Sequence, residues 1–184
     1  MSETPATARL FVALPVSATM SRKLTLIQPP KRNGVRPIDR ADLHITLHFL
    51  GGTEIASAGQ ALRSVSATRF SVGLKRPGHF SLRGQRTILS VGVDPTDALI
   101  ALHTKTGDVL RAIGCELESR PYLPHITLAR LTASAPRGAV ERFEQAVLPT
   151  DDIECSRFAL YQSETTPEGS RYRVIESYPL LATS

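Results

Sequence analysis

The feature that most constrains this chain is one tetrapeptide that occurs twice. Residues 44–47 and residues 125–128 both read His-Ile-Thr-Leu, and each copy lies in a run of β-branched and large apolar residues. Alternate side chains of a strand share a face. Each copy therefore predicts a strand that buries Ile and Leu and presents His and Thr on the opposite face. Two such strands, brought together, offer two imidazoles and two hydroxyls to one small group.

The elements around these motifs also repeat in order. The first half of the chain predicts a strand over 9–14, a helix capped by Ser17, and the first His-Thr strand over 43–50. The second half predicts a strand over 87–93, a helix that starts at Asp94-Pro95 and closes at Gly114, and the second His-Thr strand over 123–131. We interpret this order as an internal duplication.

The remaining segments complete one domain that spans residues 1–184. Further helices are expected over 56–65 and 137–147, and a further strand over 70–74. Residues 157–162 and 171–178 predict a hairpin around the turn-forming Thr166-Pro167-Glu168-Gly169 segment. We expect an α+β fold of two pseudo-symmetric lobes that face each other across a cleft.

Composition limits the setting and the partner of this fold. The net charge is +5, which favours an anionic substrate but does not separate RNA from a small phosphate ester. Cys115 and Cys155 are too few for a disulfide framework or a thiolate zinc site. No apolar run reaches about 18 residues, and the polar start of the chain does not resemble a secretory signal. We expect a cytoplasmic monomer that does not bind membranes.

The two motifs suit acid–base chemistry on a phosphodiester. In-line attack at phosphorus needs a base at the entering oxygen and an acid at the leaving one. Only His titrates near neutrality without special tuning, so His44 and His125 are the candidate pair. Thr46 and Thr127 lie two residues further along each strand, where their hydroxyls can bind the non-bridging oxygens of the phosphate.

Three residues close to the motifs are weaker candidates. His48 shares a face with His44 by alternation, but the two lie about 13 Å apart, too far to share a metal ion. We therefore place His48 at the rim of the site. Phe49 alternates into the core, with base stacking as the alternative. Arg130 alternates away from His125, which favours a surface position, unless twist at the strand end brings its guanidinium to a phosphate.

Other candidates lie further from the motifs. Tyr122 precedes the second motif and Ser163 ends a predicted strand, so either side chain can reach a base or a phosphate. His79 and His103 are expected to be ordinary surface or helix residues.

The chain resembles the 2H phosphoesterase superfamily, and within it the RNA 2′,3′-cyclic phosphodiesterases, also called 2′-5′ RNA ligases. The resemblance lies in both motifs with their flanks, residues 42–51 and 120–130, and in residues 9–14 and 158–164. It implies a bilobal α+β fold with an antiparallel sheet in each lobe and the active site between them. It also implies opening of a terminal 2′,3′-cyclic phosphate to a 2′-phosphate, without metal or cofactor. His44 would be the proton donor and His125 the proton acceptor.

The resemblance has one departure and leaves several functions open. Relatives often carry Trp near the positions of Val35 and Ser90, so a base contact there is in doubt. The expected partner is RNA with a 2′,3′-cyclic phosphate end, with tRNA halves or free cyclic nucleotides as alternative forms. The same residues would serve 2′-5′ ligation, the reverse reaction with a 5′-hydroxyl in place of water. The sequence also leaves open a small cyclic-nucleotide phosphodiesterase and a non-catalytic RNA-end binding protein.

Overall fold

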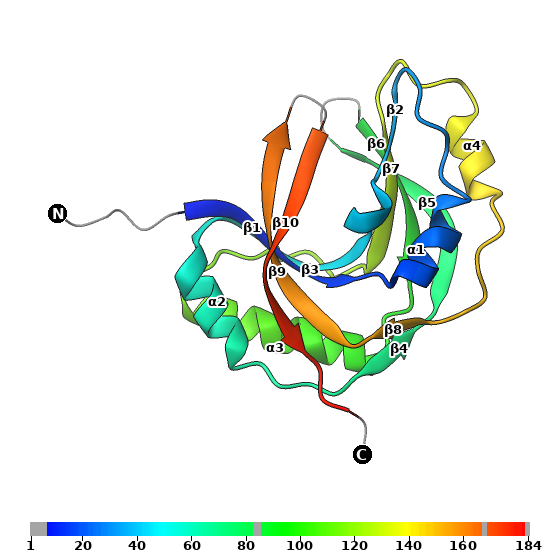
Figure 1. The fold of residues 1–184 in the computed structure, drawn as a ribbon. Coiled ribbons are helices and arrows are strands. Elements are labelled where there is room, and N and C mark those ends of the chain that lie inside the picture. The colour runs from blue at the N-terminus through cyan, green and yellow to red at the C-terminus, as the bar shows by residue number, and fades with distance from the viewer. Residues whose placement is uncertain (1–6, 83–85, 167–168, 183–184) are drawn as a thin grey trace.

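The structure, a computed structural model, describes residues 7–82, 86–166 and 169–182 (Figure 1). Its helices are α1 (Ala18–Thr25), the short 3₁₀ helix η1 (Arg40–Asp42), α2 (Ile55–Arg63), α3 (Asp97–Ala112) and α4 (Ala139–Glu144). Its strands are β1 (Thr7–Pro15), β2 (Val35–Pro37), β3 (His44–Glu54), β4 (Phe70–Val72), β5 (Leu74–Leu82), β6 (Arg86–Val93), β7 (His125–Leu131), β8 (Ile153–Cys155), β9 (Arg157–Thr166) and β10 (Gly169–Pro179).

Eight of the strands form one antiparallel sheet. Its order is β10-β9-β1-β3-β7-β6-β5, and β2 also pairs with β7. The two His-Thr strands, β3 and β7, are adjacent at its centre and are joined by a single Cα pair, Ile45 with Ile126. We call β10, β9, β1 and β3 the first half of the sheet, and β7, β6, β5 and β2 the second half. The predicted α+β class with antiparallel pairing is confirmed, and the two halves form one sheet through this junction.

The repeated order of elements is present in the structure. β1 and β3, which α1 separates in the sequence, are paired antiparallel, and so are β6 and β7, which α3 separates. α1 begins after Ser17, whose hydroxyl accepts a hydrogen bond from the Met20 amide, as predicted. α3 begins later than predicted. Its cap is Thr96, whose hydroxyl accepts from the Leu99 amide. Asp94 lies in the turn before the helix, where its amide donates to the Gly73 carbonyl and its carbonyl accepts from the Thr96 amide.

β5 is the longest of the strands that the sequence did not predict, and the short strands β2 and β8 are the others. The expected strand over 70–74 is two strands, and the second, β5, continues to Leu82 through Pro77 and Gly78. Both residues usually interrupt strands, but β5 lies at the edge of the sheet, where proline is tolerated. The predicted hairpin is confirmed as β9 and β10. Residues 167–168 of its proposed turn lie outside the described residues.

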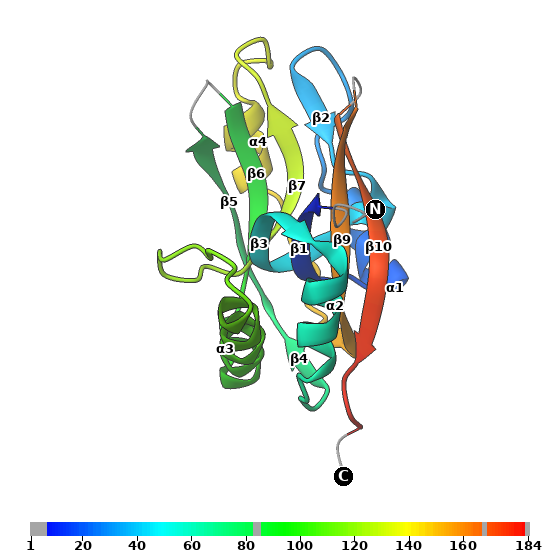
Figure 2. The ribbon, with the colours of Figure 1, turned by 90° about the vertical axis from the view of Figure 1, so that its left-hand side faces the viewer.

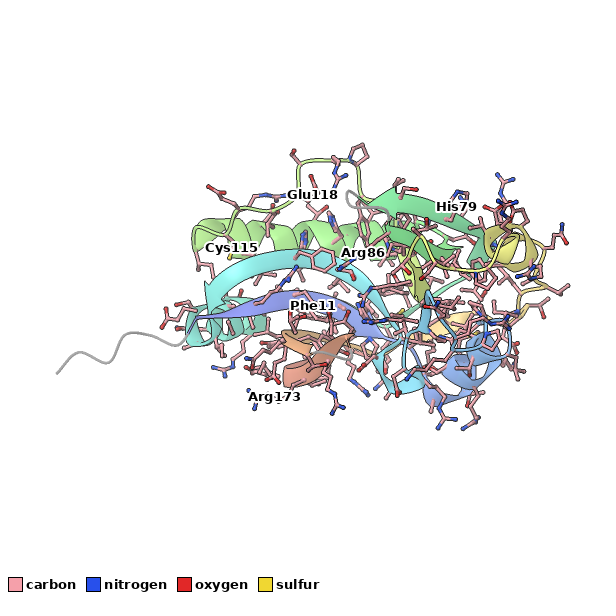
Figure 3. All side chains as sticks on the ribbon, turned by 90° about the horizontal axis from the view of Figure 1, so that it is seen from above. Phe11, His79, Arg86, Cys115, Glu118 and Arg173 are labelled. Carbon is pink, nitrogen blue, oxygen red and sulfur yellow. The ribbon has the colours of Figure 1, made fainter. Side chains whose placement is uncertain are left out.

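Most buried apolar side chains form one core cluster on the helix-covered face of the sheet. Leu10, Leu14, Ile45 and Ile126 belong to it, and α2 and α3 pack together beside the first half (Figures 1 and 2). The opposite face of β1 carries a smaller apolar cluster that includes Phe11, and Figure 3 labels this residue on β1. The His-Thr motifs present their polar side chains on this second face. Within the described ranges, no helix is both long and apolar enough to cross a membrane.

Candidate active site

The junction between β3 and β7 brings the two motifs together. Ile45 and Ile126 are directly paired and fully buried. In an antiparallel pair, the residue before one partner lies across from the residue after the other. His44 is therefore opposite Thr127, and Thr46 is opposite His125. All four of these polar side chains are half-buried, so they line one site from which solvent is partly excluded.

The two imidazoles are held in the same way. Nδ1 of His44 lies 2.6 Å from the carbonyl oxygen of Asp42, and Nδ1 of His125 lies 2.9 Å from the carbonyl oxygen of Leu123. A carbonyl oxygen only accepts, so each Nδ1–H donates to the residue two positions earlier. This fixes the tautomer of both rings and leaves Nε2 of each as the atom that can exchange a proton with a substrate.

Each motif strand changes its alternation at the end of the tetrapeptide. The register of β3 on β1 skips Leu47, and the register of β7 on β6 skips Leu128, so each strand bulges at the last residue of its tetrapeptide. The register of β3 shifts again at Leu50, which has no counterpart in β7. At Leu47 and at Leu128 the bulge residue and the next residue are both buried, and the exposed face then resumes. Phe49 and Arg130 are therefore equivalent residues on the motif face.

The bulge in β3 overturns two placements made from strict alternation. His48 is not at the rim: it is buried on the opposite face, and its Nε2 lies 2.8 Å from the His103 carbonyl of α3. Phe49 is not in the core. It is 66% exposed, and its ring lies 6.1 Å from that of Phe11, which itself contacts His44. Its position fits the base-stacking alternative.

The bulge in β7 likewise brings Arg130 onto the motif face. Its Nη2 donates to the hydroxyl of Tyr172 on β10 at 2.9 Å. β7 and β10 are four strand steps apart, which is about 19 Å in a flat sheet. The sheet must therefore curl so strongly that its halves approach each other over the motif face. The open cleft between the two lobes stays a prediction.

Aromatic rings surround His44 and shape its chemistry. Phe11 and Tyr161 lie 5.0 and 6.0 Å from its ring, and Tyr172 meets it edge-on at 5.4 Å. Burial is the main cause that lowers the pKa of His44 to about 4, and the charges of Arg130 and His125 act in the same direction. The bond to the Asp42 carbonyl opposes this shift only in part. At neutral pH, His44 of the free protein is uncharged.

His125 has a different aromatic neighbour, which sequence analysis missed. The ring of Phe80, on β5, meets His125 edge-on at 5.2 Å and stays 39% exposed. Phe80 was missed because the Pro77-Gly78 pair obscured β5. The alternating run from His79 to Leu82 was the signal that could have found it.

Tyr122 supports the first motif from behind the site. Its hydroxyl donates to the backbone carbonyl of Thr46 at 2.9 Å, and its ring stacks on His103 at 3.9 Å. His103 in turn stacks on His48 at 4.2 Å, so it lies inside a row of three rings and is not a simple surface residue. Tyr122 is thus placed to orient Thr46, and its hydroxyl is already engaged.

The remaining candidates lie at the margin of the site or beyond it. Ser163 pairs with Tyr172 and shares the face of Tyr161 by alternation. His79 is an exposed residue whose Nδ1 lies 2.7 Å from Glu144 of α4 (Figure 3). Across the described residues, no cluster of three or more His, Cys, Asp or Glu is arranged to hold a metal ion. The expectation that no metal or cofactor takes part stays a prediction.

Comparisons with known proteins agree with this arrangement. A family model described as the 2′-5′ RNA ligase superfamily matches residues 16–167. A Thermus thermophilus protein named RNA 2′,3′-cyclic phosphodiesterase is 30% identical, over 94% of this chain and 90% of its own length. A protein of the same name from Thermotoga maritima is 27% identical, over 91% of this chain and 92% of its own.

Solved structures share the fold. The crystal structure of a Thermus thermophilus protein, TT0787, matches with a TM-score of 0.79 and 26% identity, over 96% of this chain and 100% of that one. Escherichia coli LigT complexed with 3′-AMP matches with a TM-score of 0.72 and 24% identity, over 95% and 98% of the two chains. The fold is that of a phosphoesterase. The chain belongs to the 2′-5′ RNA ligase superfamily, the 2H phosphoesterases.

Proposed function

We propose that this protein is an RNA 2′,3′-cyclic phosphodiesterase that opens the terminal cyclic phosphate to a 2′-phosphate, without a metal. The observation that carries the proposal is the meeting of two identical His-x-Thr motifs at the Ile45–Ile126 junction, with both imidazoles fixed in one tautomer. A binding protein would not need two proton-transfer groups. The names of the relatives from Thermus thermophilus and Thermotoga maritima support the same activity.

The proposed reaction is an in-line displacement at phosphorus. Nε2 of His125 takes a proton from water, whose oxygen forms a new bond to phosphorus. The bond from phosphorus to O3′ breaks, and Nε2 of His44 gives its proton to O3′. The product carries a 2′-phosphate and a free 3′-hydroxyl. The hydroxyls of Thr46 and Thr127 and the guanidinium of Arg130 would bind the non-bridging oxygens, where charge accumulates.

The donor role requires His44 to gain a proton when substrate binds. The pKa of His44 is lowered to about 4 in the free protein, mainly by burial. The negative charge of a bound phosphodiester favours the imidazolium and raises this pKa. We therefore expect the alkaline limb of kcat to lie at higher pH than the alkaline limb of kcat/KM, because these quantities report the complex and the free enzyme.

The equivalence of Phe49 and Arg130 suggests how a nucleotide lies in the site. One motif strand presents an exposed aromatic ring at this position, and the other presents a cation. An aromatic ring stacks on a base, whereas a guanidinium binds a phosphate. We propose that the terminal base lies toward Phe49 and the phosphate toward Arg130, with Ser163 near the ribose. RNA ends qualify as substrate and DNA ends do not, because the cyclic phosphate needs a 2′-hydroxyl.

Phe80 favours ligation as a second candidate function. It lies beside His125, on the side from which the entering group attacks, and water has no need of an exposed aromatic ring there. A 5′-hydroxyl RNA in place of water would stack its first base on Phe80 and lose its proton to His125. Its 5′-oxygen would bond to phosphorus as the bond to O3′ breaks and His44 protonates O3′, which leaves a 2′-5′ linkage and a free 3′-hydroxyl.

The test is incubation of the protein with an oligoribonucleotide that ends in a 2′,3′-cyclic phosphate, with and without a 5′-hydroxyl RNA. A 2′-phosphate product supports the proposed function, and a 2′-5′ linked product supports the second candidate. Phe80→Leu should lower joining relative to hydrolysis. Turnover of a free cyclic nucleotide without turnover of any RNA end would move the function to small molecules.

A further inference from the structure

We propose that Tyr172 is a positioning residue: its hydroxyl holds the guanidinium of Arg130 at the phosphate site from the opposite half of the sheet. The inference rests on the proposed function, because it assigns Arg130 to the phosphate. It concerns β10, which carries neither motif and which the sequence did not connect with the site.

Arg130 needs such a support. Its long side chain has many rotamers, and a guanidinium that binds a phosphate well must present its N–H groups in a fixed plane. The hydrogen bond from Nη2 to the Tyr172 hydroxyl, 2.9 Å long, uses one of the five N–H donors and leaves four. The bond thus orients the guanidinium without exhausting its capacity for phosphate oxygens.

Tyr172 is itself held firmly. Its ring meets Phe11 edge-on at 5.0 Å and 75°, and meets His44 edge-on at 5.4 Å and 88°. These two contacts fix the ring from the floor of the site, so the hydroxyl has a defined position. One side chain therefore touches both the imidazole of His44 and the guanidinium of Arg130.

This arrangement couples the position of Arg130 to the protonation of His44. The positive charge of Arg130 lowers the pKa of His44. Among the causes that lower this pKa, only burial has a larger effect. A guanidinium released from Tyr172 would spend less time near the imidazole, and the His44 pKa would rise. The charged or titratable groups that face His44 are Arg130 and His125 from β7, Tyr161 from β9 and Tyr172 from β10, with the Asp42 carbonyl from η1.

The test compares Tyr172→Phe with Tyr178→Phe. The first removes only the hydroxyl that Arg130 uses. The second removes a hydroxyl from the same strand that donates to the Gly59 carbonyl on the core side, away from the motifs. Two readouts need no turnover: the affinity for inorganic phosphate, and the NMR titration of the His44 ring in the free protein.

We expect Tyr172→Phe to weaken phosphate binding by about tenfold, the scale of one charge-assisted hydrogen bond, and to move the His44 titration to higher pH. Tyr178→Phe should leave both unchanged. In the Arg130→Ala background, Tyr172→Phe should have little further effect, because its partner is gone. With substrate, KM should rise more than kcat falls.

Equal phosphate affinity and an unchanged His44 titration in Tyr172→Phe would overturn the inference, as would equal losses in both tyrosine variants. Absence of turnover by the wild-type protein would refute the proposed function. It would leave these binding and titration results to decide the role of Tyr172.

Discussion

At the scale of single residues, the two histidines differ in surroundings although their backbone supports match. Each imidazole is tied through Nδ1 to the carbonyl two residues earlier. His44 is enclosed by Phe11, Tyr161 and Tyr172, whereas His125 has the partly exposed Phe80 beside it. Burial lowers the pKa of His44, so the acid of the proposed mechanism becomes charged only when an anion is bound.

The histidine roles can be separated by changing the leaving group. His44→Ala and His125→Ala should each lower kcat by about 10²–10⁴. In a cyclic phosphate with sulfur in place of O3′, the sulfur leaves as a thiolate and needs no proton. This substrate should therefore restore turnover by His44→Ala and not by His125→Ala. Steady-state kinetics on both substrates measures this. Rescue of His125→Ala alone would exchange the two roles.

The threonine hydroxyls should act in the transition state. Thr46→Val and Thr127→Val remove a hydroxyl at similar volume, and each should cost about 1–3 kcal/mol in kcat/KM, because a phosphate oxygen loses its donor. Thr53→Val is the matched control on β3, since its hydroxyl donates to the Leu50 carbonyl. If kcat/KM of Thr46→Val and Thr127→Val is no lower than that of the control, these hydroxyls do not take part in the mechanism.

At the scale of elements, the two bulges decide which side chains share the motif face. The sequence predicts the motif strands, because alternation holds from His44 to Leu47 and from His125 to Leu128. It does not predict the bulges, because a bulge depends on the register of the neighbouring strand, which is a long-range property. The placements of His48, Phe49 and Arg130 therefore had to come from the structure. β5 was missed for a similar reason, since its edge position is what makes Pro77 acceptable.

The bulge in β3 leads to a prediction for Phe49. Phe49→Leu should raise KM for a cyclic-phosphate RNA by about tenfold or more, because stacking of one base on an aromatic ring contributes about 1–3 kcal/mol. kcat should change less. Ile113→Ala, at another exposed apolar side chain, controls for general surface effects. Unchanged binding of substrate by Phe49→Leu, measured by steady-state kinetics, would place the base elsewhere.

At the scale of the whole molecule, histidines with a lowered pKa link stability to pH. The pKa values of His44 and His103 are both lowered to about 4, and that of His48 is also lowered, with burial as the largest cause in each case. The unfolded chain, with histidine pKa near 6.5, takes up protons first as the pH falls. Stability conferred by these groups is thus present above about pH 6.5 and is lost as the pH falls toward about 4.

The free energy of unfolding should therefore fall as the pH is lowered from 7 to 4. His44 should contribute up to about 3 kcal/mol of this loss, and the partly exposed His103 should contribute less. Urea denaturation at pH 7 and pH 4.5 measures the difference. His103→Gln should reduce it, and the exposed position His79 offers His79→Gln as control. An equal pH dependence in wild-type protein and His103→Gln would show that His103 is not neutral and buried in solution.

The proposed function of the whole molecule is that the junction of the two His-Thr strands opens RNA 2′,3′-cyclic phosphates to 2′-phosphates without a metal. The decisive experiment is ³¹P NMR of an oligoribonucleotide with a cyclic end, incubated with the protein in excess chelator and, in parallel, with His44→Ala and His125→Ala. We expect the cyclic signal to be replaced by that of a 2′-monophosphate with the wild-type protein alone. A 3′-monophosphate product, loss of activity in chelator that one specific ion restores, or a cyclic signal that persists would contradict the proposal.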